Sequence, residues 1–410
     1  MDKELIHFEL NNGVRVIHSP AKGKIVHCAL MINAGTRDEE EENTGIAHLI
    51  EHCIFKGTRT KSSLAILNRI DSVGGELNAY TTKEETCVYV SCGLEYFERA
   101  LELLTDIVLN STFPEKEIIK EKEVICDEIH SYLDSPAEQI HDDFEALVFK
   151  DHPLGRNILG DEKRLKAVKR NALTKFVSKH YGGRKIVFSS SGNISPLKLK
   201  QLSAKYLSPF GNQTDGMDRK PFSSYKKIHA IVKKDTFQTH CLLGTVAYDS
   251  QHKHRIPMIL LNNLLGGPAM NSRLNLAIRE KFGITYNLDS SYVSYADTGI
   301  FNIYFGTDPS NMDQTLLLIH RELKKLRSRK LTELQIQSAK EQLIGQVALS
   351  QESRIGAVLN NAKNIFLFGN VDSFSTWINK VRKVSASQVL EIANEVFEEK
   401  ELSMLAFSKK

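Results

Sequence analysis

The sequence lacks the features that mark secreted, membrane-spanning and nucleic-acid-binding chains. Its six cysteines are scattered without a CxxC pair, which argues against a disulfide framework and for reduced thiols in a cytoplasmic protein. No apolar stretch approaches the roughly 18 residues of a membrane span, and the N-terminus has no basic start followed by an apolar segment. Lys and Arg number 54 against 50 Asp and Glu, so the net charge of +4 gives no reason to expect a nucleic-acid partner.

The sequence does have a globular composition and a repeated order of secondary structure. Of its 410 residues, 41% are hydrophobic and 25% are charged, which is typical of a chain with two folded domains. Strands followed by helices occur twice, so we expect two α+β domains of similar plan, each an antiparallel-rich sheet flanked by helices. The Gly-, Pro- and Ser-containing stretch 211–224 is the expected linker between domains 1–210 and 225–410.

Apolar periodicity predicts most helices of the first half. A helix is expected to begin near Thr44, whose side chain can cap it. Further helices are expected at 62–71, 95–109, 114–133 and 137–149.

The segment TGIAHLIEHCIFKGT, residues 44–58, places two histidines and a glutamate in an apolar run. At about 100° per residue, His48, Glu51 and His52 share one face of a helix. Two neutral imidazoles one turn apart suit Zn²⁺, and in an HxxEH helix the glutamate serves as general base. The HxxEH motif fixes only three positions, so chance matches are common. The alternative is two surface histidines beside a solvated glutamate.

A catalytic zinc site needs a third protein ligand, and the segment 121–133 offers two candidates. Glu121, Ile125, Glu128 and Tyr132 follow one helical stripe, so two carboxylates lie on a partly apolar face. Because the two glutamates are about 10.5 Å apart along the axis, we expect one to bind the metal and the other to support it. Spacing alone does not show which glutamate binds the metal. The alternative is that both carboxylates lie at the solvent edge of the stripe.

These segments together resemble the insulinase/pitrilysin family of zinc metallopeptidases, in the branch of the mitochondrial processing peptidases and their bacterial relatives. GIAHLIEHCIFKGT resembles the zinc helix of that family, and EKEVICDEI resembles its second conserved helix. The resemblance extends over most of the chain and implies a zinc metalloendopeptidase. It assigns His48, His52 and Glu128 as zinc ligands, Glu51 as general base and Glu121 as the supporting acid.

The segment GGELNAYTTKEETCVYVS, residues 74–91, resembles the edge strand that lies beside the zinc in this family. The resemblance implies that Asn78, Ala79 and Tyr80 pair with the substrate backbone, since a peptide can add as a strand to a free edge. The alternative is that each of these residues belongs to an ordinary strand inside a sheet.

The segment RLNLAIREKFGITY in the second half resembles the Arg/Tyr element of the family. By resemblance, Arg279 and Tyr286 face the zinc and stabilise the substrate carbonyl, which suits a cation and a phenol hydroxyl. The alternative is a surface arginine and a half-buried core tyrosine.

Some half-length chains of the family carry only one of these two elements and work in pairs, whereas this chain carries both. The resemblance therefore implies a homodimer that encloses short or unfolded peptides in a clam-like chamber, with the zinc domain of one subunit facing the second domain of the other. One alternative is a non-catalytic assembly or scaffold subunit, although such subunits usually lose ligands. Another is a structural-zinc protein, which would need a fourth protein ligand at a convincing spacing.

An acidic run, Thr36 to Asn43, precedes the HxxEH segment. We expect it to form a solvated loop. The alternative is that its charge draws basic peptides toward the site.

Overall fold

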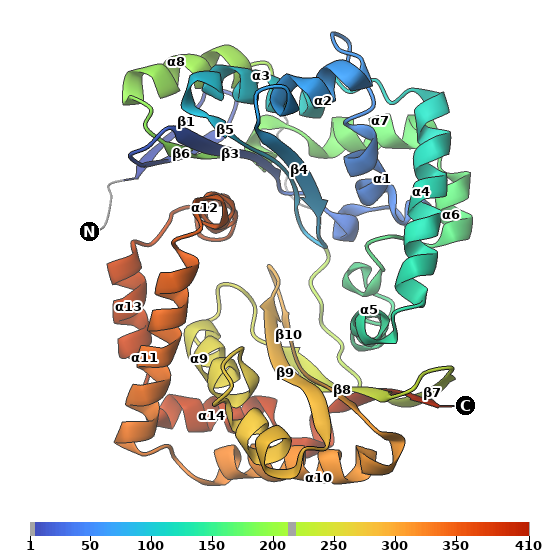
Figure 1. The fold of residues 1–410 in the computed structure, drawn as a ribbon, viewed down its shortest axis with the longest axis vertical. Coiled ribbons are helices and arrows are strands. Elements are labelled where there is room, and N and C mark those ends of the chain that lie inside the picture. The colour runs from blue at the N-terminus through green and yellow to red at the C-terminus, as the bar shows by residue number, and fades with distance from the viewer. Residues whose placement is uncertain (1–4, 212–218, 410) are drawn as a thin grey trace. The chain divides into compact units, whose positions relative to one another are not determined.

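Two β-sheets, each covered by helices on both faces, form the α+β fold in this computed structural model, which describes residues 5–211 and 219–409 (Figure 1). The chain divides into two compact units. Unit 1 combines residues 1–130, 156–219 and 350–371, and unit 2 combines 131–155, 220–349 and 372–410. The expected α+β class with two domains of similar plan is therefore confirmed.

Unit 1 holds a six-stranded sheet in the order β1-β2-β6-β3-β5-β4. Its strands are β1 (Ile6–Glu9), β2 (Arg15–Pro20), β3 (Ile25–Ile32), β4 (Glu76–Thr81), β5 (Thr86–Gly93) and β6 (Ile186–Gly192). Its helices are α1 (Ile46–Cys53), α2 (Ser63–Asp71), α3 (Phe97–Leu109), α6 (Glu162–Ala167), α7 (Arg170–His180), α8 (Pro196–Leu207) and α12 (Arg354–Phe368), together with most of α4 (Glu115–Leu133).

Unit 2 holds a five-stranded sheet in the order β7-β11-β8-β10-β9. Its strands are β7 (His229–Lys234), β8 (Thr239–Ala247), β9 (Thr285–Ser294), β10 (Gly299–Thr307) and β11 (Ser403–Lys409). Its helices are α5 (Pro136–Val148), α9 (Arg255–Gly266), α10 (Met312–Ser328), α11 (Glu333–Ser350), α13 (Phe374–Arg382) and α14 (Ala386–Val396).

The two sheets share one topology. In unit 1 the parallel pair β2–β6 is followed by the antiparallel neighbours β3, β5 and β4. In unit 2 the parallel pair β7–β11 is followed in the same way by β8, β10 and β9. Strand β1 has no counterpart in the described part of unit 2. The repeat that the sequence indicates is thus a repeat of strand order.

Alternation along the strands makes both faces of each sheet apolar. In β3, Leu30 belongs to the core that includes α3, whereas its neighbour Met31 faces the core that includes α12. This is the period of two that a pleated strand imposes. A sheet with two apolar faces needs a helical layer on each.

Each sheet obtains one of its covering helices from the distant half of the chain. Helix α12 packs on β2, β3 and β6 of unit 1, where Val358, Ala362 and Ile365 are fully buried (Figure 1). Helix α5 packs on β8 and β11 of unit 2. The consecutive domains 1–210 and 225–410 therefore each contribute a helix to the unit of the other, and residues 212–218 of the expected linker lie outside the described residues.

Helix boundaries agree closely with the periodicity of the sequence. The helix expected at 62–71 is α2, and the side chain of Ser62 accepts a hydrogen bond from the backbone N–H of Ala65 as its cap.

Along residues 5–211 and 219–409, no helix is both long and apolar enough to cross a membrane.

Candidate metal centre

Helix α1 carries the HxxEH residues and begins at a glycine. Gly45 has φ +87°, and a Cβ there would stand 2.7 Å from the carbonyl oxygen of Leu159, so glycine alone fits. Thr44 does not cap the helix as expected, because Gly45 occupies the N-cap position and the buried Thr44 hydroxyl has no hydrogen-bond partner in the described structure.

The cap of α1 comes from the acidic run instead. The carboxylate oxygens of Glu39 accept hydrogen bonds from the backbone N–H groups of Gly45 (3.0 Å) and Ala47 (2.9 Å). Burial raises the pKa of Glu39 to about 8, while these N–H donors and the cations of Arg156 and Lys83 act in the opposite direction. Glu39 therefore supplies acceptors for the otherwise unpaired backbone N–H groups at the N-terminus of the metal-site helix.

The expectation of a solvated acidic loop is accordingly wrong for part of the run. Glu39 is only 6% exposed, and Asp38 pairs with Arg219, whose Nη2 lies 2.7 Å from Oδ2. Glu41 and Glu42 are exposed, as the sequence indicates. Glu39 thus anchors the start of α1, and Asp38 is held in an ion pair.

The two imidazoles of α1 converge with one carboxylate of α4. The ring centroids of His48 and His52 are 4.7 Å apart. Oε2 of Glu128 lies 3.9 Å from Nε2 of His48 and 3.8 Å from Nε2 of His52. Two donors on one tetrahedral Zn²⁺ are roughly 3.4 Å apart, so a small side-chain adjustment brings these three atoms onto one ion.

Glu121, the other candidate ligand on α4, contacts the side of the His52 ring that is opposite Glu128. Its Oε2 is 3.1 Å from Nδ1 of His52, the ring nitrogen that does not face Glu128, and its Oε1 is 2.7 Å from Nζ of Lys56. The side chain of Glu121 is 9% exposed, whereas that of Glu128 is 46% exposed. The structure thus places Glu128 among the donors and Glu121 in the position of a supporting acid.

The protonation behaviour of the site suits a metal. Burial, followed by the neighbouring His52, lowers the pKa of His48 to about 4, so its ring is neutral at pH 7, as a metal ligand requires. Burial raises the pKa of Glu51, and its Oε2 is buried without a hydrogen-bond partner among the described residues. The donor set of two imidazoles and a carboxylate fits Zn²⁺, and Glu51 remains beside it as an uncommitted acid or base.

Strand β4, which carries Asn78, Ala79 and Tyr80, lies at the edge of the unit 1 sheet. Among the described residues it pairs only with β5, and α1 packs against it. Its outer side therefore presents backbone N–H and C=O groups next to the metal-site helix.

The Arg/Tyr element lies in unit 2. Arg279 belongs to a π-helical segment, Asn275–Glu280, and Tyr286 belongs to β9. The guanidinium carbon of Arg279 lies 5.8 Å from the centroid of the Tyr286 ring. Tyr286 is 75% exposed and is not a core tyrosine. The structure brings these two side chains together, with the phenol open to solvent.

Comparisons with known families and structures agree with this geometry. Residues 15–162 match the model of the insulinase family (peptidase family M16), and residues 167–343 match that of the peptidase M16 inactive domain. "Uncharacterized zinc protease YmxG" of Bacillus subtilis is 34% identical over 96% of this chain and 95% of its own length. An "Uncharacterized zinc protease" of Rickettsia bellii is 31% identical over 95% of this chain and 94% of its own.

Solved structures share the fold. A protease from Helicobacter pylori superposes with a TM-score of 0.91 at 20% identity, over the full length of both chains. A peptidase M16 inactive domain from Pseudomonas fluorescens gives a TM-score of 0.91 at 18% identity, over 99% of this chain and 98% of its own. The family-model matches and the curated relatives establish that the chain belongs to the insulinase family, peptidase family M16.

Proposed function

We propose that this protein is a zinc-dependent endopeptidase that hydrolyses short or unfolded peptides. The observation that carries the proposal is the convergence of His48, His52 and Glu128, with the unpartnered carboxylate oxygen of Glu51 in the same helix turn. The relatives named as zinc proteases support the choice of metal. Bound zinc would act as a Lewis acid and lower the pKa of a water molecule to about 7.

Each of the side chains and the strand at the site then has its own task in hydrolysis. Glu51 accepts a proton from the attacking water and returns it to the leaving amine. Glu121 holds the ring of His52 in place through Nδ1. The outer side of β4, including Asn78, Ala79 and Tyr80, pairs with the peptide backbone, which favours extended and unfolded substrates. Arg279 and Tyr286 donate hydrogen bonds to the substrate carbonyl oxygen.

We further propose that the working form is a homodimer in which each site is completed by the second domain of the partner. The presence of both the HxxEH element and the Arg/Tyr element in one chain supports this arrangement. A cytoplasmic location is part of the proposal, and the six cysteines, which are all free and buried, support it.

Metal analysis and peptide cleavage on the purified protein test the function. We expect bound zinc, cleavage of an internally quenched peptide, loss of cleavage with a chelator and recovery with added zinc. A disulfide-containing protein should be cleaved after reduction and unfolding but not in its folded form. Zinc-loaded protein that cleaves no peptide would instead indicate the scaffold subunit.

A further inference from the structure

A second group of metal-binding side chains occurs in unit 2, apart from the HxxEH helix. One ring nitrogen of His254 and one carboxylate oxygen each of Glu391 and Glu395 all lie within 4.8 Å of one another. The ligand atoms of His48, His52 and Glu128 lie within the same distance of one another. We propose that His254, Glu391 and Glu395 bind a second divalent transition-metal ion, with Zn²⁺ as the fitting example.

The fold brings these three residues together from two helices. His254 is the residue directly before α9, and α9 packs against α14 in the unit 2 core. Glu391 and Glu395 are four residues apart on α14, so they occupy one face of that helix in successive turns. The arrangement is local to unit 2.

Within the described part of the chain, the two carboxylates have no cationic partner. Both glutamates are exposed, and neither forms an ion pair with Lys or Arg within residues 5–211 and 219–409. Like charges four residues apart on a helix destabilise it. A divalent cation between them would turn this repulsion into attraction.

The imidazole supplies an independent indication. His254 is only 6% exposed, and its Nδ1 is buried with no hydrogen-bond partner in the described structure. Leaving a buried polar group without a hydrogen bond is unfavourable, because the group has lost its water. The group therefore contains a buried ring with unused bonding capacity beside two carboxylates that form no ion pair with Lys or Arg among the described residues, which is the composition of a metal site.

Neighbouring side chains hold two of the three ligands in place. The hydroxyl of Tyr248 donates a hydrogen bond to Oε2 of Glu395, and the Tyr248 ring stacks on His252 with centroids 4.4 Å apart. Nδ1 of His252 accepts a hydrogen bond from the backbone N–H of His254 at 3.2 Å. Through this bond His252 positions the loop directly before α9.

The donor set selects the class of ion. An imidazole with two carboxylates suits Zn²⁺ and similar transition metals, whereas Mg²⁺ prefers oxygen donors and retains its water. Donors on one zinc ion are roughly 3.4 Å apart, so atoms that lie within 4.8 Å of one another must approach by at most about 1.4 Å. The exposure of both glutamates allows this movement. The bound ion would fasten the loop before α9 to α14.

Zinc stoichiometry on the metal-free full-length protein tests the proposal. Equilibrium dialysis against Zn²⁺ should give two equivalents per chain for the wild type and one for Glu391→Gln, Glu395→Gln or His254→Ala. A chain with His48→Ala and His52→Ala should keep one equivalent, and adding Glu391→Gln to it should remove that one. Excess Mg²⁺ should not displace the second ion.

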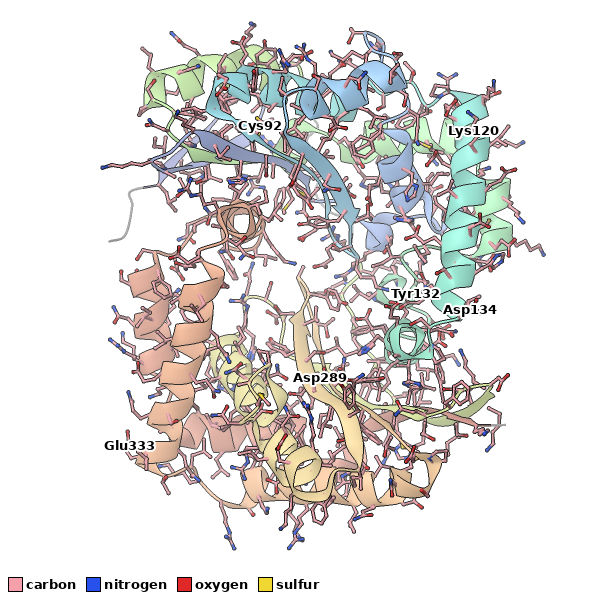
Figure 2. All side chains as sticks on the ribbon, viewed as in Figure 1. Cys92, Lys120, Tyr132, Asp134, Asp289 and Glu333 are labelled. Atoms are coloured by element: carbon pink, nitrogen blue, oxygen red, sulfur yellow. The ribbon has the colours of Figure 1, made fainter. Side chains whose placement is uncertain are left out.

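Glu333→Gln serves as the matched control, because it removes the same charge at the N-terminal end of α11, outside the cluster (Figure 2). Thermal unfolding gives a second readout: Zn²⁺ should stabilise the His48→Ala, His52→Ala chain, and Glu391→Gln should abolish that shift. Since Glu391 is exposed, its variant should fold. A single equivalent in the wild type, or two equivalents retained in Glu391→Gln and Glu395→Gln, would overturn the proposal.

Discussion

Nδ1 of His52 lies 3.1 Å from Oε2 of Glu121, while Nε2 of the same ring lies 3.8 Å from Oε2 of Glu128. One histidine thus links two carboxylates with different tasks. We predict that Glu128→Gln lowers zinc affinity more than Glu121→Gln, for which loss of a supporting partner predicts a decrease of about 10–100-fold.

Competition with a chelator at limiting zinc measures both affinities. The variants should carry Glu391→Gln, so that the metal content reports the first site alone. Glu123→Gln, exposed on the same helix, is the control and should change nothing. The opposite ranking, with Glu121→Gln emptying the site, would reverse the ligand assignment.

We predict that Glu51→Gln retains zinc but loses hydrolysis, because this carboxylate transfers protons and is not a ligand. General acid–base catalysis accounts for about 10²–10⁴-fold of the rate. Zinc analysis and cleavage of a quenched peptide on the same preparation measure both effects. Unchanged turnover at equal zinc content would remove Glu51 from the mechanism.

We predict that two inactive variants restore activity when mixed. Glu51→Gln retains Arg279 and Tyr286, and the double variant Arg279→Ala with Tyr286→Phe retains an intact metal site. If each site combines elements from two subunits, one site of a mixed dimer is complete. Random pairing makes half the dimers mixed, so the ceiling is roughly a quarter of wild-type turnover, given additive effects.

Tagged pull-down must show that the subunits exchange in this experiment. Each variant mixed with itself provides the background. Activity that stays at this background after exchange would mean that Arg279 and Tyr286 do not complete a partner's site.

We predict that Glu39→Ala destabilises unit 1, because two backbone N–H groups at the start of α1 lose their acceptor. The loss of a helix cap costs about 0.5–2 kcal/mol. Denaturant unfolding measures the change. Glu42→Ala, exposed in the same acidic run, should have no effect, and equal stability of the two variants would contradict the capping role.

We predict that stability falls with acid through His18, a buried residue of β2 whose Nδ1 lies 2.9 Å from the Ser190 hydroxyl. Burial lowers its pKa from 6.5 to about 4, so the unfolded chain binds the proton first as the pH falls. The contribution is complete above about pH 6.5 and is lost between about 6.5 and 4, by up to about 3 kcal/mol.

The comparison of His18→Gln with the wild type isolates this contribution. The variant should lose less stability than the wild type between pH 7 and 4. His7→Gln, which changes an exposed histidine, should follow the wild-type curve. Parallel curves for all three proteins would exclude His18 as a source of acid sensitivity.

Local patterns were sufficient to predict the elements of the site that lie on one helix. The 3.6-residue period places His48, Glu51 and His52 on one face, and a helix of eight residues preserves that relation. The same pattern could not choose between Glu121 and Glu128, since both share a stripe and only the packing of α4 against α1 sets the distances to the imidazoles.

Other features had no local signal. Glu39 caps α1 from within a run of four consecutive glutamates, and nothing in the sequence separates it from Glu40, Glu41 or Glu42. His254 and the two glutamates of α14 are distant in sequence and meet only because α9 and α14 pack together. An amphipathic pattern also does not tell which sheet a helix will cover, so the placements of α5 and α12 were not foreseeable.

The placement of α5 and α12 predicts how the protein behaves when its chain is cut between the two halves. A single cut between residues 212 and 218 would give two polypeptides, one carrying α5 and the other carrying α12. The first would still embed Ile140, Phe144 and Val148 of α5 in unit 2, a burial that contributes roughly 4–9 kcal/mol. The second would still cover the sheet of unit 1 with α12. The nicked fragments should therefore stay associated, and two separately encoded pieces of this chain should assemble as a complementary pair.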